Sequence, residues 1–283
     1  MKISIVIVTW NNEADIRNCL NSISCSYKFE IIVVDNASTD STRQLLRSYS
    51  GTTLILNDCN LGYARACNQG ILCSRGEYVL LLNPDTILEP SAVDIMSRFL
   101  DDHPHVGAVA PRLLNSDGST QHSVRSLPTV SSCLWEITGL PRLFPSCRSI
   151  GRWRLRWFDY GKPAEIEQPM SSCLLVRRQI LQALSGFDER FSIFYNDVDL
   201  SARMLKAGWK TIYLPQARVV HRRGASTSQA KAKMIWQTHR SLFRYLQKHD
   251  TSGLFPLKAV ILLPALEVSA LVRVLLWYMR RLH

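Results

Sequence analysis

The sequence predicts an α/β protein built around a mostly parallel, doubly wound sheet. Four short apolar runs rich in β-branched residues, at 3–9, 30–34, 53–56 and 78–82, alternate with segments that carry helical spacing or turn residues. Alternating strands and helices form parallel sheets, and strands buried on both faces are apolar at nearly every position. The chain has 283 residues, 46% of them hydrophobic, and is long enough for one large domain with a sizeable core.

The first two predicted strands each lead into a polar loop and a helix. The strand at 3–9 ends at two asparagines, and apolar residues then recur at helical spacing over 14–23. The strand at 30–34 runs directly into the acidic loop 35–40, after which a helix is predicted at 41–49. Acidic residues therefore follow the carboxyl end of the second strand.

The third and fourth strands repeat this arrangement. A loop and helix are predicted at 60–70, with Gly70 ending the helix. The fourth strand is fully apolar and is followed by an Asn-Pro-Asp turn that ends at Asp85. Ligands of such sheets bind beyond the carboxyl ends of the strands, so we expect Asp35 and Asp85 to face one site.

Residues 113–168 differ in composition from the preceding part of the chain. Prolines interrupt regular structure, and tryptophans accompany five arginines between 142 and 156. This mixture suits a mobile acceptor-binding lobe. The remaining expected elements are a strand at 170–176, a helix at 196–206, and short strands at 211–214 and 217–220 that lead to His221.

The C-terminal segment 254–279 is strongly apolar but contains Lys258, Glu267 and Arg273. These charges make it a poor candidate for a membrane span, whereas their placement suits helices that lie in the membrane interface. Pro264 is expected to kink or divide them. The alternative is a soluble helical hairpin packed on the rest of the protein.

Three domain segments follow from these patterns. Residues 1–226 form the main domain, with a nucleotide-binding half at 1–120 and an acceptor-binding half at 121–226, and residues 227–283 form a helical, membrane-associating segment. Charge divides similarly, because 1–120 carries 9 Lys and Arg against 13 Asp and Glu, whereas 121–283 carries 25 against 10. Such asymmetry suggests a polyanionic partner, namely nucleic acid, an anionic membrane, or a phosphate-bearing substrate. The alternative is a solvated basic surface without a specific partner.

The cysteines and the N-terminus bear on location. The eight cysteines include no Cys-x-x-Cys pair, so a zinc site is not expected. The apolar run after Met1 is shorter than a signal peptide requires. We therefore predict a reducing, cytosolic location.

Several carboxylates are candidates for chemistry, and each has a structural alternative. A hard divalent cation prefers carboxylate oxygen, and Asp85 is well placed to supply it, although Asn-Pro-Asp also forms ordinary turns. Asp35 is suited to bind a nucleobase or ribose, or to cap the following helix. Asp197 and Asp199 follow an aromatic-rich run at the start of a helix, where one of them is suited to act as general base or both simply favour the helix N-terminus.

The segment that begins at His221 combines an imidazole, two guanidiniums, a glycine and the Ser226 hydroxyl. These groups suit a diphosphate, although a single histidine after a strand is more often structural.

Seven motifs occur in an order that resembles one known family. They are SIVIVTWNN (4–12), VVDNASTD (33–40), NLGYARACNQG (60–70), LLNPD (81–85), GFDER (186–190), DVDL (197–200) and HRRGAS (221–226). The chain is similar to the inverting glycosyltransferase family 2 with the Rossmann-like GT-A fold, and most closely resembles its rhamnosyltransferase-like members. The resemblance covers about residues 3–226.

The resemblance implies roles for twelve residues. Nucleotide-binding roles fall on Thr9, Asn11, Asp35, Asn68 and Asn83, diphosphate contacts on His221, Arg223 and Ser226, metal binding on Asp85, the general base on Asp197, and supporting roles on Asp199 and Asn196. One departure is that similar proteins usually have Glu where this chain has Asn196, so like-charge repulsion on Asp197 is reduced.

The resemblance implies the transfer of rhamnose or another hexose, with inversion, from dTDP-rhamnose or a UDP-hexose with Mg²⁺ or Mn²⁺. The expected acceptor is a lipid-linked or oligosaccharide hydroxyl of a bacterial surface polysaccharide, at the inner face of the membrane and without a nucleic-acid partner. Two alternatives are a sugar nucleotidyltransferase, which the lack of an early Gly-rich basic loop disfavours, and an inactive basic protein that binds membrane or nucleic acid.

Overall fold

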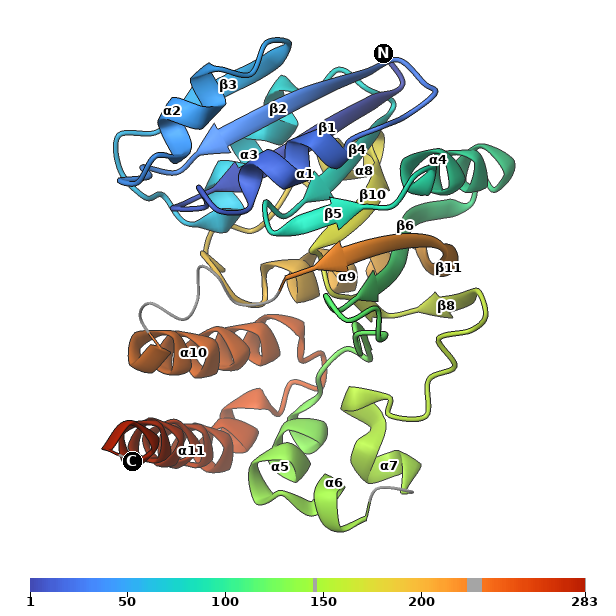
Figure 1. Ribbon diagram of the computed structural model, residues 1–283. Helices are drawn as coiled ribbons and strands as arrows, with labels where there is room; N and C mark the ends of the chain where they lie inside the picture. Colours follow the sequence, from blue (N-terminus) through green and yellow to red (C-terminus); the bar gives the residue numbers. More distant parts are fainter. Residues whose placement is uncertain (145–146, 223–230, 283) are drawn as a thin grey trace. The chain divides into compact units, whose positions relative to one another are not determined.

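A computed structural model describes residues 1–144, 147–222 and 231–282 (Figure 1). The chain forms two compact units. The first unit contains residues 1–124 and 159–226, and the second contains 125–158 and 227–283. The structure thus groups 125–158 with the C-terminal helices, whereas the sequence suggested grouping them with the main domain. The functional division at residue 226 stays a prediction.

The first unit is built on a nine-stranded sheet with the order β3-β2-β1-β4-β10-β6-β11-β5, and β8 pairs with β11. Strands β3, β2, β1 and β4 are mutually parallel, as predicted, and β10 runs antiparallel to both β4 and β6. The strands are β1 (Ile3–Thr9), β2 (Phe29–Asp35), β3 (Thr52–Leu56), β4 (Tyr78–Leu82), β5 (Thr86–Leu88), β6 (Val106–Leu114), β8 (Ala164–Ile166), β10 (Cys173–Arg177) and β11 (Lys210–His221).

Strand β11 replaces the two short strands that were predicted at 211–214 and 217–220. Its register against β6 shifts between Leu214 and Arg218, and this irregularity lies at the break expected from the sequence. Beyond it, β11 pairs antiparallel with β5, which places His221 opposite Thr86. The sequence analysis did not predict β5 or β6.

The helices of the first unit are α1 (Ile16–Ser22), α2 (Thr42–Arg47), α3 (Tyr63–Cys73), α4 (Ala92–Asp102), α8 (Arg178–Ala183) and α9 (Asn196–Lys206). The prediction that Gly70 ends α3 is wrong, because the helix continues to Cys73. A Cβ at Gly70 would lie 2.4 Å from Cγ1 of Val6. Glycine is therefore required there because α3 packs closely on β1.

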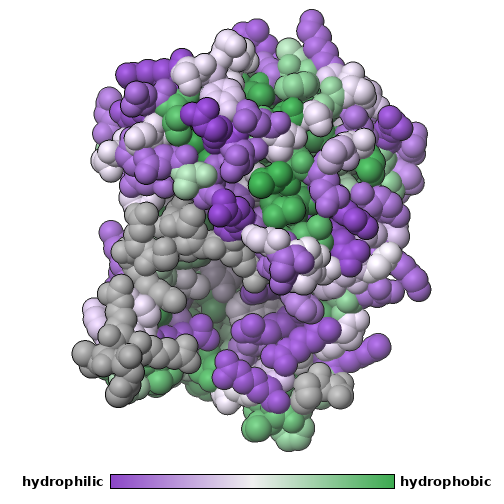
Figure 2. Space-filling model, in the orientation of Figure 1, coloured by the Kyte–Doolittle hydropathy of each residue, from purple (hydrophilic) through white to green (hydrophobic). Residues whose placement is uncertain are grey.

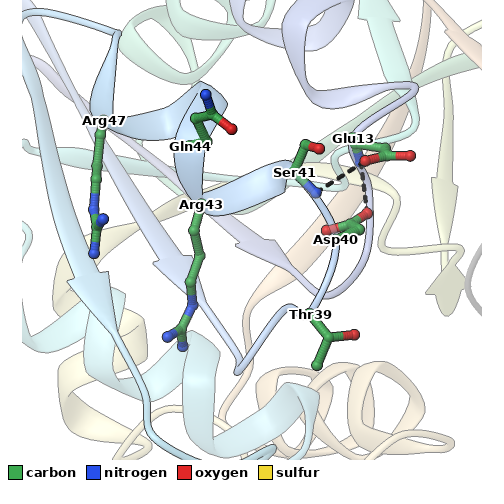
Figure 3. A pocket seen from close by; sticks show the side chains of 7 residues that line it. All are labelled: Glu13, Thr39, Asp40, Ser41, Arg43, Gln44 and Arg47. Carbon is green, nitrogen blue, oxygen red and sulfur yellow. Dashed lines mark hydrogen bonds between the residues drawn. The ribbon is translucent and has the colours of Figure 1, made fainter.

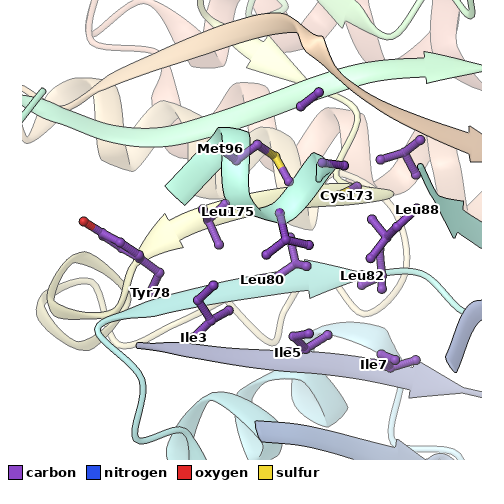
Figure 4. Packing of buried hydrophobic residues seen from close by; sticks show 14 of the residues in the cluster. Ile3, Ile5, Ile7, Tyr78, Leu80, Leu82, Leu88, Met96, Cys173 and Leu175 are labelled. Atoms are coloured by element: carbon purple, nitrogen blue, oxygen red, sulfur yellow. The ribbon is translucent and has the colours of Figure 1, made fainter. Parts of the chain in front are cut away.

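The main core lies on one face of this sheet (Figure 4). Ile3, Ile5 and Ile7 alternate along β1 toward that face, and Leu80 and Leu82 on β4 extend the same layer. Residues of α1 and α4 cover it, including Cys19 and Met96. The apolar packing anchors the strands, and their carboxyl ends carry the polar residues described below.

The second unit is mainly helical. It contains α5 (Val130–Thr138), α6 (Leu140–Leu143), α7 (Arg148–Gly151), the 3₁₀ helix η1 (Arg152–Arg154), α10 (Lys231–His249) and α11 (Phe255–Leu282). The short strands β7 (Val124–Arg125) and β9 (Gln168–Pro169) lie outside the main sheet. The Thr129 hydroxyl caps α5, and Gly139 in the left-handed region ends it.

Pro264 was expected to kink or divide this segment. Helix α11 is continuous through Pro264, so the proline does not divide it, and the kink stays a prediction. Within the described residues, Phe255–Met279 is a candidate membrane span by length and hydropathy, with a mean hydropathy of 2.2 and 17% of its most apolar window buried. The charges of this segment predicted a poor membrane span, but by length and hydropathy the helix is a candidate span. Hydrophobic side chains reach the surface of the molecule (Figure 2), and those of α11 include Val260 and Ile261.

Candidate active site

The first part of the site is a buried carboxylate at the end of β2. Thr9 and Asp35 are register partners on β1 and β2, and the Thr9 hydroxyl donates to Asp35 Oδ1 at 3.2 Å. Asp35 Oδ2 accepts from the Ser38 backbone N–H at 3.1 Å and from Arg43 Nε at 2.6 Å. Ser41 occupies the N-cap position of α2, six residues after Asp35, so the helix-cap alternative for Asp35 is wrong. Instead, Asp35 is held by Arg43, which the sequence analysis missed.

Asn11 joins two loops at the same edge of the sheet. Its backbone is left-handed, with φ of 54°, and its N–H donates to the Ser38 hydroxyl at 2.9 Å. Its side-chain oxygen accepts from the Thr39 backbone N–H at 2.8 Å. Asn11 therefore fixes the loop beside Asp35, and its proposed contact with a nucleotide stays a prediction.

A pocket of about 660 Å³ lies beside this loop, and Figure 3 shows Arg43 and Arg47 extending from α2 along one side of it. Glu13 accepts from the Ser41 N–H and donates its own backbone N–H to Asp40. The pocket is lined by Glu13, Thr39, Asp40, Ser41, Arg43, Gln44 and Arg47. It contacts the candidate site through Arg43, and its lining includes none of the predicted catalytic carboxylates.

Carboxamides missed by the sequence analysis fix the ends of β2 and β3. Asn36 Nδ2 donates to Asn60 Oδ1 at 2.9 Å. Asn57 and Gln69 exchange two hydrogen bonds of 2.9 Å, and Asn57 also donates to Asn36 Oδ1 at 3.2 Å. Asn36 and Asn60 lie in motifs that were quoted for the resemblance, but their pairing depends on the fold.

Asn68 holds a distant loop. Its Nδ2 donates to the Phe187 carbonyl at 2.9 Å, and its Oδ1 accepts from the Phe187 N–H at 2.8 Å. A Cβ at Gly186 would lie 2.3 Å from Asn68 Oδ1, so this contact requires glycine. These bonds occupy both ends of the amide and support a positioning role, while the predicted nucleotide contact of Asn68 is untested.

Asp85 ends the turn that follows β4, and one of its carboxylate oxygens is unsatisfied. Its Oδ1 is buried and has no hydrogen-bond partner among the described residues. His221 Nε2 lies 3.5 Å from that oxygen, and the Arg222 N–H donates to the Asp85 carbonyl at 2.9 Å. The pairing of β5 with β11 thus brings His221 beside Asp85. Leaving a buried carboxylate oxygen unpaired is costly, which makes this oxygen suited to a cation.

The partners of His221 determine which of its nitrogens carries the proton. Gln121 Nε2 donates to the His221 carbonyl at 2.7 Å, so the other end of the amide, Oε1, faces His221 Nδ1 at 3.1 Å. Because Oε1 can only accept, Nδ1 carries the proton. In the neutral ring Nε2 is then an acceptor, 3.2 Å from the Ser172 hydroxyl. A neutral imidazole nitrogen beside a carboxylate oxygen suits Mn²⁺.

The protein supplies only part of a cation shell. Within the described residues, no group of three or more His, Cys, Asp or Glu side chains is arranged to hold a metal ion. A divalent ion at Asp85 and His221 would therefore need further ligands, such as phosphate oxygens and water. Arg223 and Ser226, the other predicted diphosphate ligands, lie outside the described residues. Arg222, which was not singled out, donates to Asp15 Oδ1 at 3.0 Å.

Tyr63 contacts the turn that carries Asp85. The Tyr63 hydroxyl donates to Asn83 Oδ1 at 3.4 Å. Burial, with Cys67 nearby, raises the pKa of Tyr63 well above its usual range, and the carboxylates of Asp197 and Asp85 raise it further. Both carboxylates therefore act electrostatically on one phenol, although they are remote in sequence.

Asp197 and Asp199 both lie in the first turn of α9 but differ in environment. Asp197 is partly exposed, and its Oδ1 accepts from the Val198 N–H at 2.9 Å. Asp199 is fully buried and accepts from Arg203 Nε at 2.7 Å. Arg203 in turn donates to the carbonyls of residues 184 and 186 at 2.8 Å each. Asp199 therefore has a structural role, which leaves Asp197 as the accessible carboxylate.

Asn196 has two hydrogen bonds that explain its residue type. Its Nδ2 donates to the Ile193 carbonyl at 2.8 Å, and its Oδ1 accepts from the Asp197 N–H at 2.7 Å. An ionised Glu has no N–H to donate to that carbonyl. The carboxamide thus fixes the backbone from which Asp197 projects.

Solved structures share this fold. A mannosyltransferase from Pyrobaculum calidifontis, in complex with GDP-Man and Mn²⁺, matches with a TM-score of 0.61 at 18% identity, over 100% of this chain and 81% of that one. TarS 1–349 of S. aureus in complex with UDP-GlcNAc matches with a TM-score of 0.56 at 20% identity, over 93% of this chain and 70% of that one. At these identities the likeness concerns the fold, which is the predicted GT-A α/β fold.

Sequence comparisons are more specific. The chain is 30% identical over 271 residues to an N-acetylglucosaminyl-diphospho-decaprenol L-rhamnosyltransferase of Mycobacterium tuberculosis, covering 86% of this chain and 83% of the relative. It is 23% identical to the O-antigen chain rhamnosyltransferase WbaN of Salmonella anatum, covering 68% of this chain and 56% of that protein. Residues 4–164 match the family profile of Glycosyl transferase family 2. The chain therefore belongs to glycosyl transferase family 2 and is a glycosyltransferase.

Proposed function

We propose that this glycosyltransferase moves a hexose from a nucleoside diphosphate to an acceptor hydroxyl in a single displacement that inverts the anomeric centre. Asp197 takes the proton of the hydroxyl, the oxygen attacks the anomeric carbon, and the bond from that carbon to the diphosphate oxygen breaks. The observation that carries the proposal is the buried, unpaired Asp85 Oδ1, which lies 3.5 Å from His221 Nε2. The carboxylates of Asp85 and Asp197 also both raise the pKa of Tyr63, which supports one shared site.

A divalent ion, Mg²⁺ or Mn²⁺, fits beside Asp85. The unpaired Oδ1 and the acceptor nitrogen of His221 would hold it, together with oxygens of the donor's diphosphate. When bound, the ion supplies positive charge against the negative charge that accumulates on the departing diphosphate. His221 then contributes through the cation, in addition to the predicted contact with the diphosphate.

The donor's nucleoside would bind where β1 and β2 end. There Thr9 and Asp35 form a buried pair, and Arg43 balances the carboxylate. Asn11 holds the adjoining loop, and Asn83 extends toward Tyr63. The donor is dTDP-rhamnose or a UDP-hexose; the names of the rhamnosyltransferase relatives favour rhamnose.

The proposed acceptor is a lipid-linked saccharide of a bacterial surface polysaccharide. Support comes from the decaprenol-linked substrate named for one relative and the O-antigen named for another. The exposed apolar side chains of α11 support contact with the membrane. The helix is also a candidate span by length and hydropathy, but its charged residues favour a peripheral position at the cytoplasmic face. The lipid carrier and the enzyme would then share one surface.

Two substitutions test the chemistry. We expect Asp197→Asn to remove the base and Asp85→Ala to remove the cation ligand, each lowering transfer by about a thousandfold. The exposed Asp58→Asn serves as the matched control and should stay within about twofold of the parent protein. Transfer is measured with a panel of nucleotide sugars and a membrane lipid fraction, and the anomeric configuration of the product by NMR. Full activity in both variants, or retention of configuration, would refute the assignment.

A further inference from the structure

Positive charge concentrates in the second unit. It contains 15 Lys and Arg against 3 Asp and Glu, a net +12, whereas the first unit contains 19 against 20, a net −1. The same unit exposes large apolar side chains on α11, among them Val260, Leu271 and Leu275. A surface that is both basic and apolar suits a ligand with an anionic head and an apolar chain.

A groove of about 320 Å³ between α10 and α11 combines both properties. Trp236, Arg240, Phe243 and Arg244 recur at helical spacing on α10 and line one wall. The opposite wall comes from α11 and includes Leu263. Aromatic and aliphatic groups thus alternate with two guanidiniums along one cavity.

The charges in the groove leave a net positive site. Glu267 is the one acidic residue of its lining, against Arg240 and Arg244. Arg240 is exposed and forms no ion pair with any residue that the structure describes. His239 also lines the groove, and burial lowers its pKa, although the hydrogen bond of its Nδ1 with the Ile235 carbonyl at 2.8 Å acts in the opposite direction. Arginine presents a planar fork that matches phosphate oxygens.

We propose that the groove between α10 and α11 binds the phosphate headgroup of a membrane lipid, with the first part of the lipid chain against Trp236 and Phe243. This inference rests on the membrane location in the proposed function and adds a specific site to it. A soluble phosphate would use the guanidiniums but not the aromatic wall. A lipid phosphate uses both, and the exposed apolar residues of α11 continue from the groove along the same helix.

The test compares two double variants of the full-length chain on the same helix. Arg240→Gln with Arg244→Gln removes two charges from the groove, and Lys233→Gln with Lys248→Gln removes two exposed charges outside its lining. Sedimentation is measured with phosphatidylcholine vesicles that contain either phosphatidylglycerol or a polyprenyl phosphate. We expect the groove variant to lose about tenfold more vesicle affinity than the lysine variant in at least one lipid.

The two vesicle types identify the source of the phosphate. A loss confined to polyprenyl phosphate identifies the carrier lipid, and a loss with phosphatidylglycerol identifies bulk phospholipid. Equal losses in the two variants would mean diffuse surface attraction and would overturn the site, as would an absence of binding by the parent chain. Release of nucleoside diphosphate from the sugar donor is measured separately. Groove variants should keep that activity, so failure of the lipid site is distinguishable from failure of the proposed catalysis.

Discussion

The two units of this chain treat charge and apolar surface in opposite ways. In the first unit, Asp35 and Asp199 are fully buried, and each is paired with an arginine. In the second unit, large apolar side chains such as Val260 on α11 are exposed, and the net charge is +12. The first pattern holds buried carboxylates in one orientation. The second leaves apolar and basic side chains at the surface.

The two units also differ in which free energy a substitution changes. A buried ion pair that loses one partner leaves an uncompensated charge, so substitutions there destabilise the fold. An exposed leucine contributes little to folding in water, but its transfer from water to a membrane is favourable. Stability measurements should therefore respond to the first unit, and membrane partitioning to the second.

The largest expected effect on stability is at Asp199. Asp199→Ala leaves Arg203 without its carboxylate in a buried setting, and we expect the free energy of unfolding to fall by about 3 kcal/mol. Asp197→Ala, on the same helix turn, removes a partly exposed charge and should cost about 1 kcal/mol or less. Urea unfolding followed by tryptophan fluorescence measures both. Similar losses of unfolding free energy in the two variants would mean that the difference in burial does not determine how much each carboxylate contributes to stability.

Much of the first unit could be predicted because its central strands β1 and β4 are buried along their whole length and are mostly apolar. The seven residues of β1 are all buried, and β4 is equally apolar, so both were located without the structure. The polar residues after them were then expected at one edge of the sheet. Asp35 and Asp85 were identified in this way, whereas His221 was identified by the basic and hydroxyl groups that follow it in the sequence.

The contacts that orient those residues could not be predicted. Gln121 and Ser172 meet His221 from 100 and 49 residues away, because Gln121 follows β6, which pairs with β11, and Ser172 precedes β10, which pairs with β6. Gly70 was mistaken for a helix end because its glycine is required by packing against Val6, which is a tertiary feature. The grouping of 125–158 with the C-terminal helices likewise depends on contacts between distant parts of the chain.

An intermediate effect is expected on the apolar surface of α11. Leu271 and Leu275 are about half exposed, at 50% and 52%, and lie four residues apart on one side of the helix. Leu271→Ser with Leu275→Ser should lower partitioning into phosphatidylglycerol vesicles by about thirtyfold, with little change in unfolding. Leu72→Ser, at an 85% exposed site in the first unit, is the matched control and should leave partitioning unchanged. Unchanged partitioning of the double variant would mean that this side of α11 does not contribute to membrane binding.

The smallest expected effect concerns Gln121, the uncharged side chain that accepts a hydrogen bond from His221. Gln121→Ala removes the acceptor that keeps the proton on Nδ1, so the ring would spend time with Nε2 protonated and unable to bind a cation. Loss of such a partner weakens metal binding by about tenfold or more. Titration calorimetry with Mn²⁺ and a nucleoside diphosphate measures the affinity, and ¹⁵N NMR of the imidazole reports the tautomer. Gln168→Ala removes another buried glutamine, whose Nε2 donates to the Pro169 carbonyl, and should leave both measurements unchanged. If Gln121→Ala bound Mn²⁺ as tightly as the parent chain, buried pairing in the first unit would serve stability alone and not the orientation of His221.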